Sequence, residues 1–131
     1  MARILIIDDE SQIRSMLRLM LERVAYEVIE AEDGMEGIRQ YRDNPADLII
    51  TDLIMPNKDG IGMIIELKKE FPQVKIIAMS GGGVNRPEGD LDGAQKLGAT
   101  RTLTKPIDRD EMLNAVRETL KADTASAKPS I

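Results

Sequence analysis

The chain has 131 residues, of which 42% are hydrophobic and 31% are charged, a balance typical of one soluble globular domain. It contains no Cys and no His, which excludes Cys-His and Ser-His-Asp catalysis, zinc fingers, haem sites and iron–sulfur clusters. The net charge of −5 is repelled by phosphate backbones, so we expect no nucleic-acid binding by this chain alone. The longest apolar run, residues 4–7, is too short to span a bilayer and no signal-peptide segment precedes it, so we expect a cytoplasmic protein without membrane contact.

Short apolar runs rich in β-branched residues predict five strands, at residues 3–7, 27–31, 48–51, 74–79 and 100–103. Between these runs, apolar residues recur at helical spacing. The clearest helical stripe consists of Ile13, Met16, Leu17, Met20, Leu21 and Val24. Weaker stripes lie within residues 35–41, 61–68, 91–97 and 112–120. We interpret Met16, Met20 and Met112 as core residues rather than as the lining of a partner groove.

The alternation of strands and helices predicts a parallel sheet, because a crossover helix returns the chain to the start of the next strand. We therefore expect an α/β fold: a doubly wound five-stranded parallel sheet, flavodoxin-like (βα)5, with strand order 2-1-3-4-5. The domain is expected to span residues 1–122, with residues 123–131 forming a flexible tail or the stump of a linker. Four glycines and a proline predict a long, mobile loop from Gly81 to Gly89.

Charged and hydroxyl side chains follow the predicted strands. Asp8 and Asp9 follow the first strand and Asp52 the third, while Ser80 and Lys105 follow the fourth and fifth. Ligands of such sheets bind beyond the carboxyl ends of the strands, near the point where the strand order reverses. Three converging carboxylates need a counter-charge, and Mg²⁺ prefers oxygen ligands of this kind. We therefore predict an aspartyl-phosphate site in which one carboxylate is the nucleophile and Lys105 offsets transferred charge.

Each of these residues also has a simpler interpretation. Asp8 and Asp9 can cap the first helix, and Asp52 and Ser80 can be turn residues. Lys105 can be an ordinary exposed lysine. Their joint occurrence at strand ends favours the site over the separate structural roles.

Five motifs, in order along the chain, resemble the receiver domain of bacterial two-component response regulators. They are Asp8-Asp9, the run DLIMPNKDG at residues 52–60, Ser80-Gly81, Gly98-Ala99 and Leu103-Thr104-Lys105-Pro106. The resemblance extends over residues 2–121. It implies a signal transduction domain that accepts a phosphoryl group on Asp52, in a Mg²⁺-dependent reaction, from a sensor histidine kinase or phosphotransfer protein. Phosphorylation then switches a protein-interaction surface.

The resemblance also implies a role for each motif residue. The expected Mg²⁺ ligands are Asp8, Asp9, Asp52 and the backbone carbonyl of Ile54. Ser80 is expected to be the switch hydroxyl that closes onto the phosphoryl group. Lys105 is expected to form the ion pair with the phosphate and to precede a cis bond to Pro106. A receiver of this kind is not an enzyme, since its only chemistry is its own phosphorylation and dephosphorylation.

Two positions depart from patterns found among receivers. Thr102 replaces the switch aromatic, usually Tyr or Phe, so the output face is expected to respond differently. Ile54 stands where some relatives have a polar residue that helps water attack the phosphoryl group, which predicts slow self-dephosphorylation.

The resemblance implies a downstream protein target or an output domain, contacted through the fourth helix, fifth strand and fifth helix. The same face can also serve a homodimer. The chain can be a stand-alone receiver or part of a longer protein.

Two other functions remain alternatives. A phosphohydrolase of the haloacid dehalogenase type needs a second Asp two residues after the nucleophile, where this chain has Ile54. A phosphorylation-independent interaction module is suggested by Thr102, but such a module has no need for clustered carboxylates.

Overall fold

The computed structural model describes residues 2–53, 60–80 and 98–127. In chain order, its strands and helices are β1 (Arg3–Ile7), α1 (Ser11–Glu22), β2 (Glu27–Ala31), α2 (Gly34–Asp43), β3 (Leu48–Asp52), α3 (Gly60–Glu70), β4 (Ile76–Ser80), β5 (Arg101–Thr104) and α5 (Arg109–Ala127). The predicted helix at residues 91–97 and the predicted loop from Gly81 to Gly89 lie outside the described residues.

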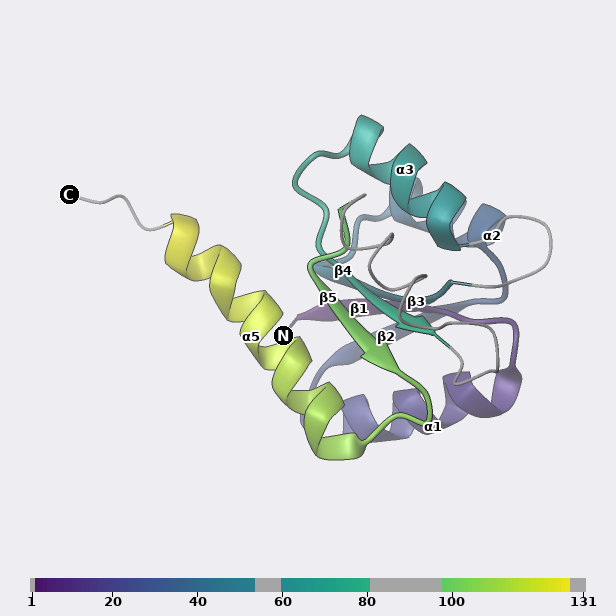
Figure 1. Ribbon diagram of the computed structural model, residues 1–131, viewed down its shortest axis with the longest axis vertical. Coiled ribbons are helices and arrows are strands. Elements are labelled where there is room, and N and C mark those ends of the chain that lie inside the picture. The colour runs from purple at the N-terminus through teal and green to yellow at the C-terminus, as the bar shows by residue number, and fades with distance from the viewer. Residues whose placement is uncertain (1, 54–59, 81–97, 128–131) are drawn as a thin grey trace.

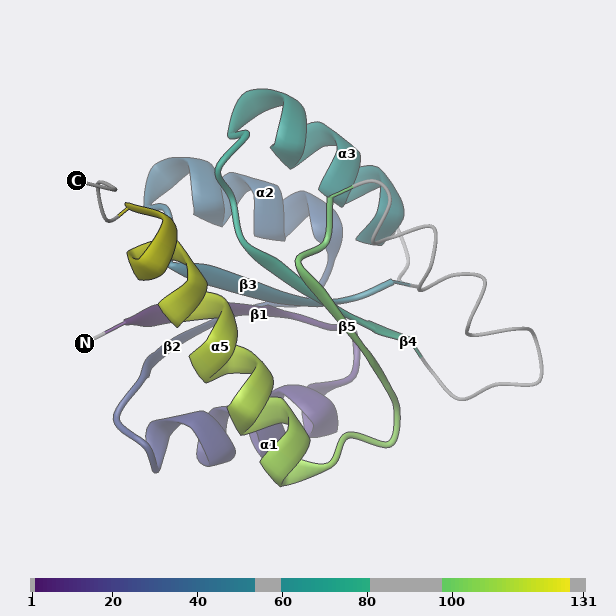
Figure 2. The same ribbon diagram turned by 60° about the vertical axis from the view of Figure 1, so that its left-hand side comes forward.

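The five strands form one parallel sheet in the order β2-β1-β3-β4-β5, which confirms the predicted fold. Figures 1 and 2 show α2 and α3 on one face of the sheet and α1 and α5 on the other. The chain passes from β1 to β2 on one side and later to β3 on the other side of β1. The strand order therefore reverses between β1 and β3, where ligands of such sheets bind.

Alternate residues of strands β1 to β4 enter two separate hydrophobic clusters. In β1, Leu5 and Ile7 pack into the cluster that contains residues of α2 and α3. Ile4 and Ile6 pack into the cluster that contains residues of α1 and α5. Leu17 of α1 is fully buried in this second cluster, and burial of one such side chain contributes roughly 1.5–3 kcal/mol. Because both faces are covered, the positions of the strand ends are set by packing from both sides.

Side-chain caps begin two of the helices. The Asp33 carboxylate accepts a hydrogen bond of 2.9 Å from the backbone N–H of Glu36 at the start of α2. The Asp108 carboxylate accepts one of 2.9 Å from the N–H of Glu111 at the start of α5. These bonds fix where the chain leaves the sheet edge.

Three of the predicted strands have different ends in the structure, and the smallest difference is that β3 continues one residue further than predicted, to Asp52. The predicted strand at residues 74–79 begins too early, because the N–H of Val74 donates to the carbonyl of Phe71 within a turn. Val74 is nevertheless buried, so hydrophobicity alone did not reveal the turn. The fifth strand lies one residue later than predicted, at Arg101–Thr104.

Helix α5 continues to Ala127, into the segment whose composition predicted an irregular tail. Alanine has the highest helix propensity, so Ala122, Ala125 and Ala127 allow the helix to continue without an apolar stripe. The division into a domain at residues 1–122 and a tail at residues 123–131 stays a prediction. No helix in the described part of the chain is long and apolar enough to cross a membrane.

Candidate functional site

The strand ends bring the predicted site residues to one edge of the sheet. Asp52 is the last residue of β3, and Asp8 directly follows its neighbour β1. Ser80 is the last residue of β4, and Lys105 directly follows β5. This edge includes the carboxyl ends of β1 and β3, the two neighbouring strands between which the strand order reverses. Residues that are far apart in the sequence are therefore neighbours here.

Three carboxylates converge at this edge, and we call Asp8, Asp9 and Asp52 the acidic cluster. One carboxylate oxygen from each lies within 4.8 Å of those of the other two. Asp8 is fully buried, Asp52 is 6% exposed and Asp9 is exposed. Lys105 Nζ lies 3.0 Å from Asp8 Oδ2 and 3.5 Å from Asp52 Oδ1. Among the residues that the structure describes, one ammonium faces these three carboxylates, which leaves an excess of negative charge when all are ionised.

The surroundings of Asp52 raise its pKa to about 6. Burial is the largest cause, because it disfavours the charged carboxylate, and the negative charge of Asp8 acts in the same direction. The positive charge of Lys105 opposes both but does not cancel them. At neutral pH Asp52 is therefore largely ionised, yet its charge is poorly compensated and would be stabilised by a further cation.

The pKa of Lys105 is raised. Burial alone would lower it, but the negative charge of Asp52 and the hydrogen bond to Asp8 outweigh that effect. Lys105 therefore remains a cation at neutral pH.

Asp8 does not cap α1, whose N-cap is Glu10 without a side-chain cap hydrogen bond, but its two carboxylate oxygens make two different contacts. Its Oδ1 accepts a hydrogen bond of 2.9 Å from the N–H of Glu10, which fixes the turn that leads into α1. Its Oδ2 accepts the hydrogen bond from Lys105. The helix-entry role and the site role use different oxygens of one carboxylate.

The backbone of Asp52 is packed closely against the start of α3. The side-chain Oδ1 of Asp52 accepts a hydrogen bond of 3.0 Å from the N–H of Leu53. A Cβ on Gly60 would lie 2.3 Å from the carbonyl oxygen of Asp52 and 2.8 Å from Cα of Leu53. Both atoms belong to the backbone, so a side chain at Gly60 would displace Asp52. In the sequence, Gly60 was only the last residue of the motif at residues 52–60, with no expected role of its own.

Ser80 and Lys105 are linked through the backbone. The N–H of Lys105 donates a hydrogen bond of 2.8 Å to the carbonyl of Ser80, and Ser80 is buried. The bond between Lys105 and Pro106 is cis, as the resemblance implied. Thr102 lies farther back in β5, half-buried and paired with Ala78, so it is not brought to the acidic cluster. Ile54 lies outside the described residues.

Two residues at this edge were not anticipated. Arg14 of α1 donates a hydrogen bond of 2.7 Å from Nη1 to the backbone carbonyl of Asp8. Glu10 Oε1 lies 3.8 Å from Lys105 Nζ. Neither residue belongs to the motifs at the strand ends, and the only signal for Arg14 was a charged residue beside the apolar stripe of its helix.

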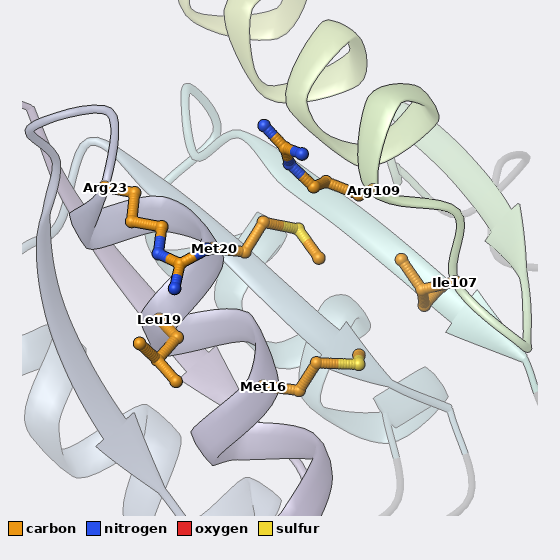
Figure 3. Close-up of a pocket in the computed structure, with 6 residues that line it drawn as sticks. All are labelled: Met16, Leu19, Met20, Arg23, Ile107 and Arg109. Atoms are coloured by element: carbon orange, nitrogen blue, oxygen red, sulfur yellow. The ribbon is translucent and has the colours of Figure 1, made fainter.

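An apolar groove lies on a different part of the surface, between α1 and the segment that leads into α5 (Figure 3). Its lining consists of Met16, Leu19, Met20, Arg23, Ile107 and Arg109. Met16 is 38% exposed, so its interpretation as a core residue was wrong, whereas Met112 is fully buried as predicted. Met16 points along the helix surface toward Ile107 instead of into the sheet. The described residues of this lining carry no carboxylate or hydroxyl with which to supply the predicted chemistry.

Comparison with known proteins identifies relatives along nearly the whole chain. Residues 4–117 match the family described as response regulator receiver domain. The chemotaxis protein CheY of Bacillus subtilis is 35% identical over 119 residues, which cover 90% of this chain and 97% of that protein. The transcriptional regulatory protein GlrR of Escherichia coli is 33% identical over 92% of this chain, but the match covers only 26% of GlrR.

A solved structure has the same fold. The response regulator receiver domain protein from Clostridium thermocellum superimposes with a TM-score of 0.88 and is 31% identical, with 95% of this chain and 98% of that chain covered. The strand order, the strand-end residues and these matches agree with one another. The chain belongs to the response regulator receiver domain family, whose known function is phosphorylation-dependent signalling.

Proposed function

We propose that Asp52 is the phosphoacceptor of this receiver domain and that its donor is a phosphohistidine of a sensor kinase or phosphotransfer protein. The observation that carries the proposal is the position of Asp52, nearly buried at the end of β3 beside Asp8 and Lys105. A nucleophile for phosphoryl transfer needs nearby charges that offset the transferred phosphoryl oxygens, and this edge provides them.

The acidic cluster fits Mg²⁺ as the cofactor. Its donors are carboxylate oxygens, and the raised pKa of Asp52 indicates negative charge that a cation would stabilise. We propose that Asp8, Asp9 and Asp52 hold the ion, with the backbone carbonyl of Ile54 added from the family resemblance. When bound, Mg²⁺ would neutralise charge on the phosphoryl oxygens.

The chain's own groups account for the transfer step. An oxygen of the Asp52 carboxylate forms a bond to phosphorus while the phosphorus–nitrogen bond of the donor breaks. The electron pair of that bond stays on the imidazole nitrogen, which takes up a proton from water. Lys105 keeps its proton, since its pKa is raised, and offsets the charge of the new aspartyl phosphate.

The switch would use Ser80 as the hydroxyl that closes onto the phosphoryl group. The location of Ser80 at the end of β4, beside β3, supports this role. Thr102, in place of the switch aromatic, would leave the change to be transmitted by other parts of the domain. Slow self-dephosphorylation remains our expectation because Ile54 provides no polar group for water.

We propose a protein target or an output domain as the downstream partner. The two kinds of relative illustrate both arrangements, since the match covers 97% of Bacillus subtilis CheY but only 26% of GlrR. A homodimer through β5 and α5 is a further form of output. We propose that the domain works in the cytoplasm, where it would meet its donor kinase.

Intact-mass measurement after incubation with acetyl phosphate and Mg²⁺ tests the proposal. We expect a gain of one phosphoryl group in the wild type and in Asp43→Asn, which alters an exposed carboxylate at the end of α2. We expect no gain in Asp52→Asn, and none in the wild type when EDTA removes Mg²⁺. Phosphorylation of Asp52→Asn would refute the assignment. No gain in a folded wild type would instead favour the phosphorylation-independent interaction module.

A further inference from the structure

The guanidinium of Arg14 links the acidic cluster to the neighbouring strand β2. Its Nη1 donates a hydrogen bond of 2.7 Å to the backbone carbonyl of Asp8, and its Nε donates one of 3.0 Å to Glu30 Oε1. The Arg14 side chain is only 14% exposed. A partly buried arginine of α1 is thus directed at the backbone of a site residue.

The Asp8 peptide groups are held from two directions. The N–H of Asp8 donates a hydrogen bond of 3.2 Å to the carbonyl of Ala31, the last residue of β2. The carbonyl of Asp8 accepts the bond from Arg14. This carbonyl belongs to the peptide that joins Asp8 to Asp9. The bond from Arg14 therefore fixes the orientation of the peptide from which both carboxylates project.

Glu30 in β2 fixes the guanidinium in turn. Its carboxylate accepts hydrogen bonds from both Arg14 and Arg18. Burial alone would raise the pKa of Glu30, but the bonds from Arg18 and Arg14 outweigh burial and lower it. Glu30 therefore stays ionised and offsets part of the positive charge of Arg14 and Arg18. Arg14 can then orient the acidic cluster while its own repulsion of a cation is reduced.

We infer that Arg14 is a positioning residue that preorganises Asp8 and Asp9 for Mg²⁺, and that Glu30 orients Arg14 for this task. The inference rests on the proposed function, because it assumes that the acidic cluster binds Mg²⁺. Groups that orient metal ligands typically change metal affinity by about 10–100-fold when they are removed.

Calorimetric titration of the full chain with Mg²⁺ tests the inference directly, since it needs no phosphoryl donor. We expect Arg14→Gln to weaken Mg²⁺ binding by about tenfold or more. Arg14→Lys should also weaken binding, because lysine keeps the charge but lacks the planar fork that contacts Asp8 and Glu30 together. Arg18→Lys is the matched control. It alters the other arginine on Glu30, whose hydrogen bonds go to Glu22, Glu30 and the carbonyl of Val28, and should change affinity by less than about twofold.

The direction of the effect separates positioning from charge. Removing the positive charge of Arg14 would by itself strengthen the binding of a cation, so weaker binding by Arg14→Gln requires a positional cause. Glu30→Gln should weaken binding in the wild-type background and have a smaller effect in the Arg14→Gln background. An equal effect of Glu30→Gln in both backgrounds would contradict its action through Arg14.

Backbone amide shifts of Asp8, Asp9 and Glu10, followed by NMR during the titration, report the geometry of this turn directly. We expect Arg14→Gln to change these shifts in the metal-free protein, and a folded variant with wild-type shifts and affinity within about twofold would overturn the inference. If Arg14→Gln does not fold, Arg14→Lys and Glu30→Gln provide the same comparison. Absence of Mg²⁺ binding in the wild type would overturn the proposed function itself. Wild-type binding that Arg14 does not influence would overturn only the inference.

Discussion

Two cation–carboxylate clusters in this protein have similar chemistry but different surroundings. Lys105 lies between Asp8 and Asp52, at 3.0 and 3.5 Å. Arg42 of α2 lies between Glu66 and Glu70 of α3, at 3.0 and 2.7 Å. The Lys105 side chain is 13% exposed, whereas that of Arg42 is 45% exposed. Each cation bridges two carboxylates, yet one cluster is inside the molecule and the other is in water.

The exposed Arg42 cluster has the shorter contacts, but these contacts contribute little to the stability of the fold. Water and salt screen exposed ion pairs, so Arg42 adds little to stability despite its several hydrogen bonds. The Lys105 cluster is screened much less. Burial there, with a smaller contribution from the negative charge of Asp8, raises the pKa of Asp52 against the opposing charge of Lys105. Poor charge balance in a buried place, rather than close pairing, therefore distinguishes the candidate site.

The largest effect is expected from removing the cation of the buried cluster. Lys105→Met should lower the rate of phosphorylation by acetyl phosphate and Mg²⁺ by about 10²–10³-fold, because no fixed ammonium would offset the phosphoryl charge. Initial rates from intact mass measure the effect. Lys75→Met, which changes a half-buried lysine bonded to the carbonyl of Leu120, should leave the rate unchanged. Equal rates for wild type and Lys105→Met would remove Lys105 from the mechanism.

An intermediate effect is expected on stability as a function of pH. The pKa of Asp52 is about 6 in the folded protein against 3.8 for a free side chain, so the metal-free folded state binds this proton more tightly than the unfolded state. The ionised group therefore destabilises the fold by about 3 kcal/mol above pH 6, and this penalty disappears below about pH 4.

Asp52→Asn removes this titration. In EDTA the variant should be more stable than the wild type at pH 8, and the difference should shrink as the pH falls through 6 toward 4. Urea unfolding at several pH values measures it. Mg²⁺ should stabilise the wild type more than the variant. A stability difference that is independent of pH would show that ionisation of Asp52 does not destabilise the folded protein.

The smallest effect is expected for the exposed cluster. Arg42→Ala should lower the urea midpoint only slightly, and the difference from the wild type should shrink at high salt, because the pairs with Glu66 and Glu70 are already screened by solvent. Phosphorylation should be unaffected. A large loss of stability that persists at high salt would erase the contrast between the two clusters.

Much of the fold and the site could be predicted because each strand end is recognisable from a short segment of sequence and all these ends lie at the same edge of a parallel sheet. An apolar run followed by Asp, as at Asp52, marks both a buried strand and the residue at its carboxyl end. Parallel pairing then gathers these ends on one edge. The hydrophobic pattern could not decide whether Val74 begins a strand or ends a turn. It also could not decide how much of Met16 stays exposed, since that depends on which neighbours cover α1.

The sequence by itself determined the class of fold, the strand order expected for it and the residue types at the sheet edge, because apolar periodicity and strand-end residues are properties of short segments. Only the tertiary structure decided that Arg14 contacts the Asp8 carbonyl and that Gly60 lies against the backbone of Asp52. These are contacts between separate elements, whose distances depend on how the helices pack against the sheet. The shifted pKa of Asp52 has the same origin, because burial and the charges of Asp8 and Lys105 act on it only after the chain has folded.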